Sequence, residues 1–179
     1  MRILYQHTSR TIMNRKQFFQ QSIIAGATRA VAPQAYSHAQ DKDPKLDKTI
    51  VQEFVGAGHR DLDKVKQLLG EHPTLLNAAH DWKYGDFETC LGAACHVGHK
   101  ELATFLIEQG AQANIFTAAL FGHIAIIKPY LAAFPAALYA KGPHGFTLLH
   151  HADRGGDEAL EVKEHLLSLG ATEMKVALY

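Results

Sequence analysis

The sequence lacks several features that would assign it to a particular class of protein. Its 179 residues include only two cysteines, Cys90 and Cys95. On a helix, a spacing of five residues turns two side chains about 140° apart, so no disulfide is expected between them. The formal net charge is zero, from 18 basic and 18 acidic side chains, which argues against a broad charged surface for nucleic acid or anionic lipid. No run of about 18 or more apolar residues occurs, so no membrane-spanning helix is predicted.

Common catalytic motifs are also missing. The chain contains neither G-x-S-x-G nor H-E-x-x-H, the motifs of many hydrolases and zinc proteases. It has no phosphate-binding G-x-x-x-x-G-K-[ST] loop and no basic stripe with interleaved aromatic residues. Acidic residues are scattered along the expected surface helices, which is typical of a solvated face. We therefore expect no catalytic residue, no cofactor and no nucleic-acid partner.

Residues 1–39 have the segment order of an export signal. Arg15 and Lys16 form a short basic region, a mildly apolar stretch follows, and a small-x-small site at residues 37–39 precedes Gln40. Arg-Lys-x-Phe-Phe resembles the twin-arginine motif, although a lysine replaces the second arginine. We predict a periplasmic or exported protein. The alternative is a polar tail or amphipathic helix on a cytoplasmic protein.

A Gly-His dipeptide recurs along the rest of the chain. It occurs at Gly58-His59, Gly98-His99 and Gly122-His123, with Gly156-Asp157 in the equivalent place. The steps of 40, 24 and 34 residues average just under 33, which falls within the range of structural repeats. Each glycine is followed by a helical pattern that ends in paired apolar residues, so each unit is predicted to contain a helical hairpin.

This pattern resembles the ankyrin repeat, a β-turn followed by two antiparallel helices. The family pattern runs Thr-Pro-Leu-His-x-Ala, Gly-His, Val-Val-x-x-Leu-Leu and Gly-Ala, and residues 89–114 fit its spacing without a gap. Thr147, Leu149, His150 and Ala152 match the opening of the last unit. The chain further resembles a group of small bacterial ankyrin proteins. The resemblance implies an all-α solenoid of about four helix-turn-helix repeats with short β-turn fingers, in which neighbouring units share one core.

The resemblance also sets the expected domain boundaries. The repeat domain is predicted over residues 49–173, after a charged linker at 40–48 and before a C-terminal tail at 174–179. Residues 1–39 form the targeting segment, and Met13 is an alternative start of the chain.

Two departures from the repeat pattern predict local irregularities. The short step of 24 residues indicates that the finger between the second and third units is missing. Pro129 falls inside the second helix of the third unit, where it removes a backbone donor. We expect a kink or a break at Lys128.

The histidines need separate interpretations. In the family pattern the residue at His150 is structural, and it ties its turn to the neighbouring backbone. His151 lies about 100° further around the helix, toward the concave face that usually binds partners, so the two histidines are not expected to share a metal ion. The run containing Cys95, His96 and His99 suggests a zinc site, but Gly98 is expected to end the helix between the two histidines. We assign no metal ligand.

The predicted binding surface lies on two fingers, residues 80–88 and 141–146, which flank a gap left by the missing finger. Trp82 either covers the open side of the first helix pair or anchors a partner. We predict a monomeric, non-catalytic module that binds another protein. The alternatives are a metal-assisted hydrolase that uses Cys95, His96 and His99, and an accessory protein that binds a small ligand. The predicted partner-binding residues are Trp82, Tyr84, Asp86, Phe87, His96, His144, Phe146 and His151.

Overall fold

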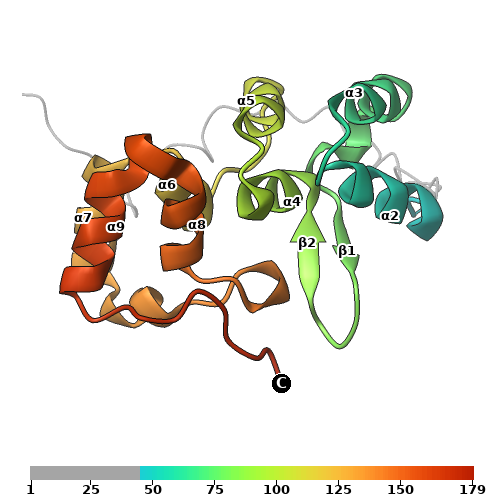
Figure 1. Ribbon diagram of the computed structural model, residues 1–179. Helices are drawn as coiled ribbons and strands as arrows, with labels where there is room; N and C mark the ends of the chain where they lie inside the picture. The colour runs from blue at the N-terminus through green and yellow to red at the C-terminus, as the bar shows by residue number, and fades with distance from the viewer. Residues whose placement is uncertain (1–44) are drawn as a thin grey trace, which may run out of the picture. The chain divides into compact units, whose positions relative to one another are not determined.

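Residues 45–179 are described by a computed structural model, in which helical hairpins follow one another (Figure 1). The predicted targeting segment and most of the linker lie outside the described residues. The α-helices are α2 (Lys48–Ala57), α3 (Leu62–Glu71), α4 (Cys90–Val97), α5 (Lys100–Glu108), α6 (Ile115–Leu120), α7 (Ile124–Ala133), α8 (Leu148–Gly155) and α9 (Leu160–Ser168). Strands β1 (Ala79–Asp81) and β2 (Phe87–Thr89) and the short 3-10 helices η1 (Pro73–Asn77), η2 (Pro135–Tyr139), η3 (Pro143–Gly145) and η4 (Gly156–Ala159) complete the described elements.

This mostly helical chain with one small strand pair is consistent with an ankyrin-repeat fold. The helices pair as α2 with α3, α4 with α5, α6 with α7 and α8 with α9, and the first helices contact one another in chain order. No helix within residues 45–179 combines the length and the apolar character that a membrane span needs.

Side-chain caps set where the first helices begin. Thr89 and Thr147 each accept a hydrogen bond from a backbone N–H in the first turn of the helix that follows. Asn114 does the same for α6, where Thr117 completes a reciprocal capping box. Such caps satisfy backbone donors that have no partner within the helix, and each contributes roughly 0.5–2 kcal/mol. The threonine and asparagine positions of the repeat pattern therefore fix the phase of the last three hairpins, and Asp47 caps the first.

The core consists of two hydrophobic clusters. One lies between the first two helix pairs and contains Phe54, Leu102 and Leu106, while the other lies between the last two pairs and contains Ile127 and Leu166. All five side chains are fully buried, and burial of each contributes roughly 1.5–3 kcal/mol. Helix α6 joins the two halves because it contacts both α4 and α8.

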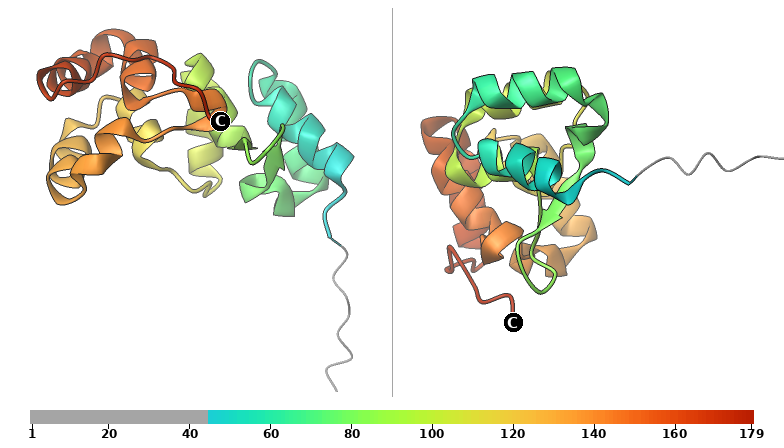
Figure 2. Two further views of the ribbon diagram at one scale, coloured as in Figure 1. Left: turned by 90° about the horizontal axis from the view of Figure 1, so that it is seen from below. Right: turned by 90° about the vertical axis from the view of Figure 1, so that its right-hand side faces the viewer.

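Two fingers project from the same side of the first helices (Figures 1 and 2). The first is the antiparallel β1–β2 hairpin, in which His80 pairs with Glu88. The second contains η3, and His144 there adopts a left-handed backbone conformation with φ of 57°. Between them, residues 109–114 contain no strand, which agrees with the predicted loss of the middle finger.

One expectation about local structure, the break at Lys128, is wrong. Helix α7 runs without a break through Pro129. Pro129 and Ala125, the residue whose carbonyl loses its donor, are both exposed, so water can replace the missing hydrogen bond. The C-terminal tail at 174–179 makes backbone contacts with the rest of the domain. Thr147 N donates to Met174 O at 3.1 Å, and the tail runs back along the second finger.

Candidate functional site

The two fingers are joined by one buried carboxylate. Asp86, in the turn of the first finger, accepts hydrogen bonds from the backbone N–H of His144 at 2.8 Å and from its Nδ1 at 2.7 Å. Burial alone would raise the pKa of Asp86, but the bonds from His144 outweigh it, and the pKa lies below its ordinary value. The left-handed conformation of His144 lets its backbone and its ring reach the same carboxylate.

Glu88 is the centre of a cluster of histidines. Its side chain is fully buried on β2, and the indole N–H of Trp82 donates to Glu88 Oε2 at 2.7 Å. His96 Nε2, from α4, lies 2.9 Å from Glu88 Oε1. The Nε2 atoms of His59 and His144 lie 3.5 and 3.4 Å from Glu88 Oε2. We call Glu88 and these three histidines the His3Glu cluster.

The hydrogen bonds of the rings fix which nitrogen faces the cluster. His59 Nδ1 lies 3.1 Å from the carbonyl oxygen of Gly56, which can only accept, so this nitrogen carries the proton. His144 Nδ1 donates to Asp86 in the same way. In their neutral forms both rings therefore point an unprotonated Nε2 toward Glu88.

The charge of Glu88 is favoured despite its burial. Loss of solvent raises the pKa of its carboxyl, but His96, Trp82 and His59 beside it lower the pKa by more, and it lies below the ordinary value. Glu88 Oε1 nevertheless has no hydrogen-bond partner among the described residues, although His96 Nε2 lies 2.9 Å away. A buried carboxylate oxygen without a donor is uncommon in a folded protein. Three imidazole nitrogens and a carboxylate are also ligands that a transition metal can take.

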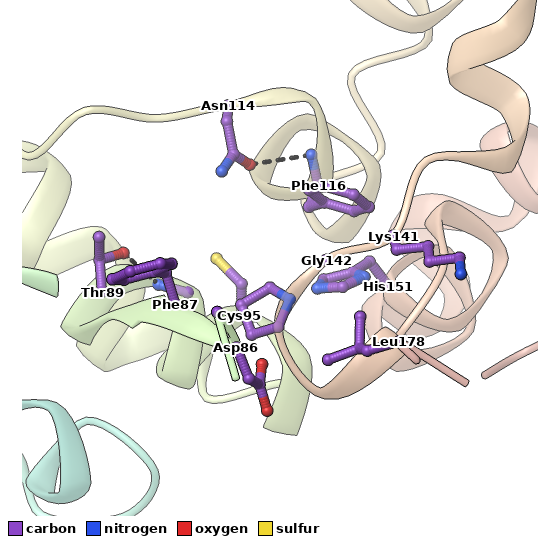
Figure 3. Close-up of a pocket in the computed structure, with 13 residues that line it drawn as sticks. Asp86, Phe87, Thr89, Cys95, Asn114, Phe116, Lys141, Gly142, His151 and Leu178 are labelled. Atoms are coloured by element: carbon purple, nitrogen blue, oxygen red, sulfur yellow. Dashed lines mark hydrogen bonds between the residues drawn. The ribbon is translucent and has the colours of Figure 1, made fainter. Parts of the chain in front are cut away.

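A cavity of about 240 Å³ lies beside this cluster, between the two fingers (Figure 3). Phe87 and Thr89 line it from the first finger, Lys141 from the second, and Phe116 from α6. Asn114, at the start of α6, also lines it. For comparison, an apolar cavity of about 150 Å³ is large enough for benzene. The cavity can therefore take one large side chain or a small molecule.

The predicted partner-binding residues divide by exposure. Tyr84 and Phe87 are 88% and 63% exposed at the tip and edge of the first finger. Trp82, His144 and Phe146 are half-buried, and Asp86, His96 and His151 are buried. Trp82 packs against the core of the first two helix pairs, which favours its interpretation as a cover.

His151 was expected to lie toward the concave face that binds partners, and the structure places it in the lining of the cavity between the fingers. Its side chain is fully buried and lines the cavity, with its ring 5.0 Å from the ring of Phe116. Burial is the main reason that its pKa is lowered to about 4. His150 has the predicted structural role, because its Nε2 donates to the backbone oxygen of His96 at 2.8 Å.

The structure does not assemble the residues of the hydrolase alternative. Cys95 Sγ donates to Thr117 Oγ1 at 3.6 Å, and burial raises the pKa of Cys95 to about 11, so its thiol is a poor nucleophile. His99 instead caps α5 by accepting from Leu102 N at 3.3 Å. Of the three predicted ligands, only His96 joins a cluster of possible metal-binding side chains within residues 45–179.

Sequence reasoning missed Glu88 and His59. Glu88 lies at the end of the predicted finger 80–88 but received no role, and His59 was interpreted as a turn residue of the repeat. A local signal existed for Glu88, because the strand alternates exposed Phe87, buried Glu88 and half-buried Thr89, and a carboxylate on the inner face of a strand needs a partner.

Comparison with known proteins agrees with the architecture. An ankyrin repeat family model matches residues 86–119, which cover β2, α4, α5 and most of α6. "Protein fem-1 homolog A-like" from Mus musculus is 46% identical over 47 residues. That match covers 26% of this chain and 7% of the mouse protein, so the chain spans only a small part of the length of this relative. The two matches support an ankyrin repeat protein, and ankyrin repeats generally mediate protein–protein interaction without catalysis.

Proposed function

We propose that this chain is a non-catalytic module that binds another protein through its two fingers. The observation that carries the proposal is the cavity between the fingers, which combines an open apolar rim with a fixed floor. Phe87 lies exposed at the rim, and exposed aromatic residues beside a pocket are typical of binding hot spots. The partner segment inserts one large side chain into the cavity and packs its neighbours against Phe87 and Tyr84.

The floor of the cavity adds a chemical preference. His151 Nδ1 lies 2.7 Å from Thr147 O and carries the proton. His151 Nε2 is therefore an acceptor, and it has no hydrogen-bond partner among the described residues. A buried acceptor of this kind favours a ligand that brings a donor. We infer that the inserted side chain is apolar in body and carries an N–H or O–H group.

The test fills the cavity without disturbing the fold. Gly92 lies on α4 and lines the cavity, and a Cβ there would meet its nearest atom at an ordinary 3.4 Å. Gly92→Leu places a side chain in the cavity, whereas Gly70→Leu on α3, where nothing lies within 4 Å, is the matched control. Peptides selected from a random displayed library on the wild-type chain are then measured against both variants. We expect Gly92→Leu to weaken binding by roughly 30-fold or more and Gly70→Leu to leave it unchanged.

A substitution outside the cavity distinguishes a protein partner from a small ligand. Tyr84 is outside the cavity lining, and its ring lies 5.6 Å from the ring of Tyr179 between centroids. Tyr84→Ala weakens a peptide that lies across the finger and spares a small molecule held in the cavity. Selected peptides that bind Gly92→Leu as well as wild type would contradict the proposed site.

We further propose export for this protein, on the basis of the basic, apolar and small-x-small order in residues 14–40. N-terminal sequencing of the protein isolated from its source is expected to find Gln40 first. A mature chain that begins at Met1 or Met13 would contradict export.

A further inference from the structure

The His3Glu cluster brings together side chains from four separate segments. His59 lies in the turn after α2, Glu88 on the first finger, His96 on α4 and His144 on the second finger. One ligand atom from each lies within 4.8 Å of every other. Two imidazole nitrogens, His59 Nε2 and His96 Nε2, lie only 3.1 Å apart. Such a convergence needs an explanation beyond chain topology, because like polar atoms are seldom packed together in a core.

The distances fit ligands around one ion. In a tetrahedral zinc site with bonds of about 2.0–2.1 Å, neighbouring ligand atoms stand roughly 3.3 Å apart. The Nε2 atoms of His96 and His59 lie 3.1 Å apart. Glu88 Oε1 lies 2.9 Å from His96 Nε2, and Glu88 Oε2 lies 3.4 and 3.5 Å from the Nε2 atoms of His144 and His59. These distances lie on both sides of that separation, so the side chains stand close enough to share an ion.

The proton positions are also those of a metal site. His59 Nε2 and His144 Nε2 are unprotonated when their rings are neutral, because Gly56 O and Asp86 take the Nδ1 protons. Both lone pairs then face Glu88, which is itself an acceptor. Facing acceptors repel one another unless a proton or a metal cation lies between them. The unpartnered Glu88 Oε1 points to the same conclusion.

Supporting groups hold each ligand in place. Asp86 orients His144, a backbone carbonyl orients His59, and the Trp82 indole holds Glu88. Metal-binding histidines typically donate their second N–H to a carboxylate or a carbonyl in this manner. Two buried carboxylates, Asp86 and Glu88, would also balance the charge of one divalent cation.

We propose that His59, Glu88, His96 and His144 bind one divalent transition metal, with zinc as the expected ion. Three imidazole nitrogens with a single carboxylate suit zinc and the neighbouring transition metals, whereas magnesium and calcium prefer oxygen ligands. Four protein ligands make a closed, structural site. The ion joins the turn after α2 to both fingers, so it fixes the walls of the cavity. The proposal does not depend on partner binding.

The test measures zinc binding by the full chain, produced without a histidine tag. The chain is stripped with a chelator, returned to buffer and titrated with Zn²⁺ against a chromophoric competitor. We expect one site per chain and a melting temperature that rises with zinc. Glu88→Gln and His144→Asn abolish the site, and Asn is chosen because it tolerates the left-handed backbone at that position. Asp86→Asn weakens zinc affinity by roughly 10–100-fold.

Matched variants keep the outcome interpretable. His123→Ala removes an exposed histidine at the turn before α7, which makes no side-chain capping bond, and it is expected to bind zinc as wild type does. Should Glu88→Gln fail to fold, His59→Gln tests the same site from a half-exposed turn. Equal zinc affinity in wild type and the ligand variants would place the metal elsewhere and overturn the proposal. Absence of a zinc site in the stripped wild-type chain would overturn it in favour of a metal-free network of ion pairs.

Discussion

The turns after α2 and α4 both read Gly-His, yet they have different structures. Gly98 has a left-handed φ of 81° and ends α4, and His99 directly after it caps α5. Gly58 is right-handed with φ of −53°, and the next helix is capped by Asp61, whose carboxylate accepts from Lys64 N at 2.9 Å. The turn after α2 is longer by two residues, which releases His59 from capping. Its ring can then join the His3Glu cluster, so position relative to the helix end decides the role of each histidine.

The adjacent histidines of α8 extend this comparison and give the largest expected effect. The pKa of His151 is lowered from 6.5 to about 4, so the unfolded chain takes up a proton at higher pH than the folded one. The contribution of neutral, buried His151 to the free energy of unfolding is fully present above pH 6.5. It is lost as the pH falls toward 4, and the total loss is about 3 kcal/mol. In chelator, the stability of His151→Gln is expected to depend less on pH over this window than that of wild type, as measured by urea unfolding.

The control for this titration is the exposed His123. His123→Gln is expected to keep the wild-type pH dependence. If His151→Gln and wild type lose stability in parallel on acidification, the assigned cause of acid sensitivity is wrong.

Alanine at the two turn glycines separates steric overlap from backbone strain. At Gly58 a Cβ would lie 2.7 Å from Cys90 O, whereas at Gly98 the nearest atom is 3.3 Å away and the left-handed φ is the obstacle. Each alanine is expected to cost about 2 kcal/mol in the free energy of unfolding. Asparagine tolerates left-handed backbone, so Gly98→Asn should recover part of the loss and Gly58→Asn should not. Recovery at both positions, or at neither, would contradict the assigned difference between the turns.

Removal of the His99 cap of α5 is expected to give the smallest change in stability. His99→Ala is expected to lower the stability of the metal-free chain by about 1 kcal/mol, and His99→Asn to restore it, because asparagine is a strong N-cap. At position 59 the same pair of substitutions should be indistinguishable, since Asp61 caps α3. Thermal unfolding in chelator measures both comparisons. A restoring effect of asparagine at position 59 would show that the two turns are equivalent after all.

The sequence was sufficient for the features that repeat. Helix pairing, the structural role of His150 and the loss of the middle finger follow from spacing and caps, which are local. The site was harder to predict from the sequence, because its members are spread from residue 59 to residue 144 and no local motif joins them. Because Gly58-His59 and Gly98-His99 have the same residue types, His59 was also interpreted as an ordinary turn residue.

Two further features of the structure have physical causes outside the local pattern. His151 is buried because Phe116 lies over its ring, a contact that depends on how closely α6 packs against α8. Pro129 is tolerated because the carbonyl it deprives of a donor lies on the exposed face of α7. Neither the packing distance nor the exposed face can be read from the residue types alone.

X-ray absorption spectroscopy at the zinc edge of the purified full chain tests the role of His59 most directly. We predict a shell of three nitrogen atoms and one oxygen atom at about 2.0–2.1 Å, unchanged in His99→Gln and altered in His59→Gln. A sulfur ligand at about 2.3 Å, or identical spectra from both variants and wild type, would contradict the assignment of the metal to the His3Glu cluster.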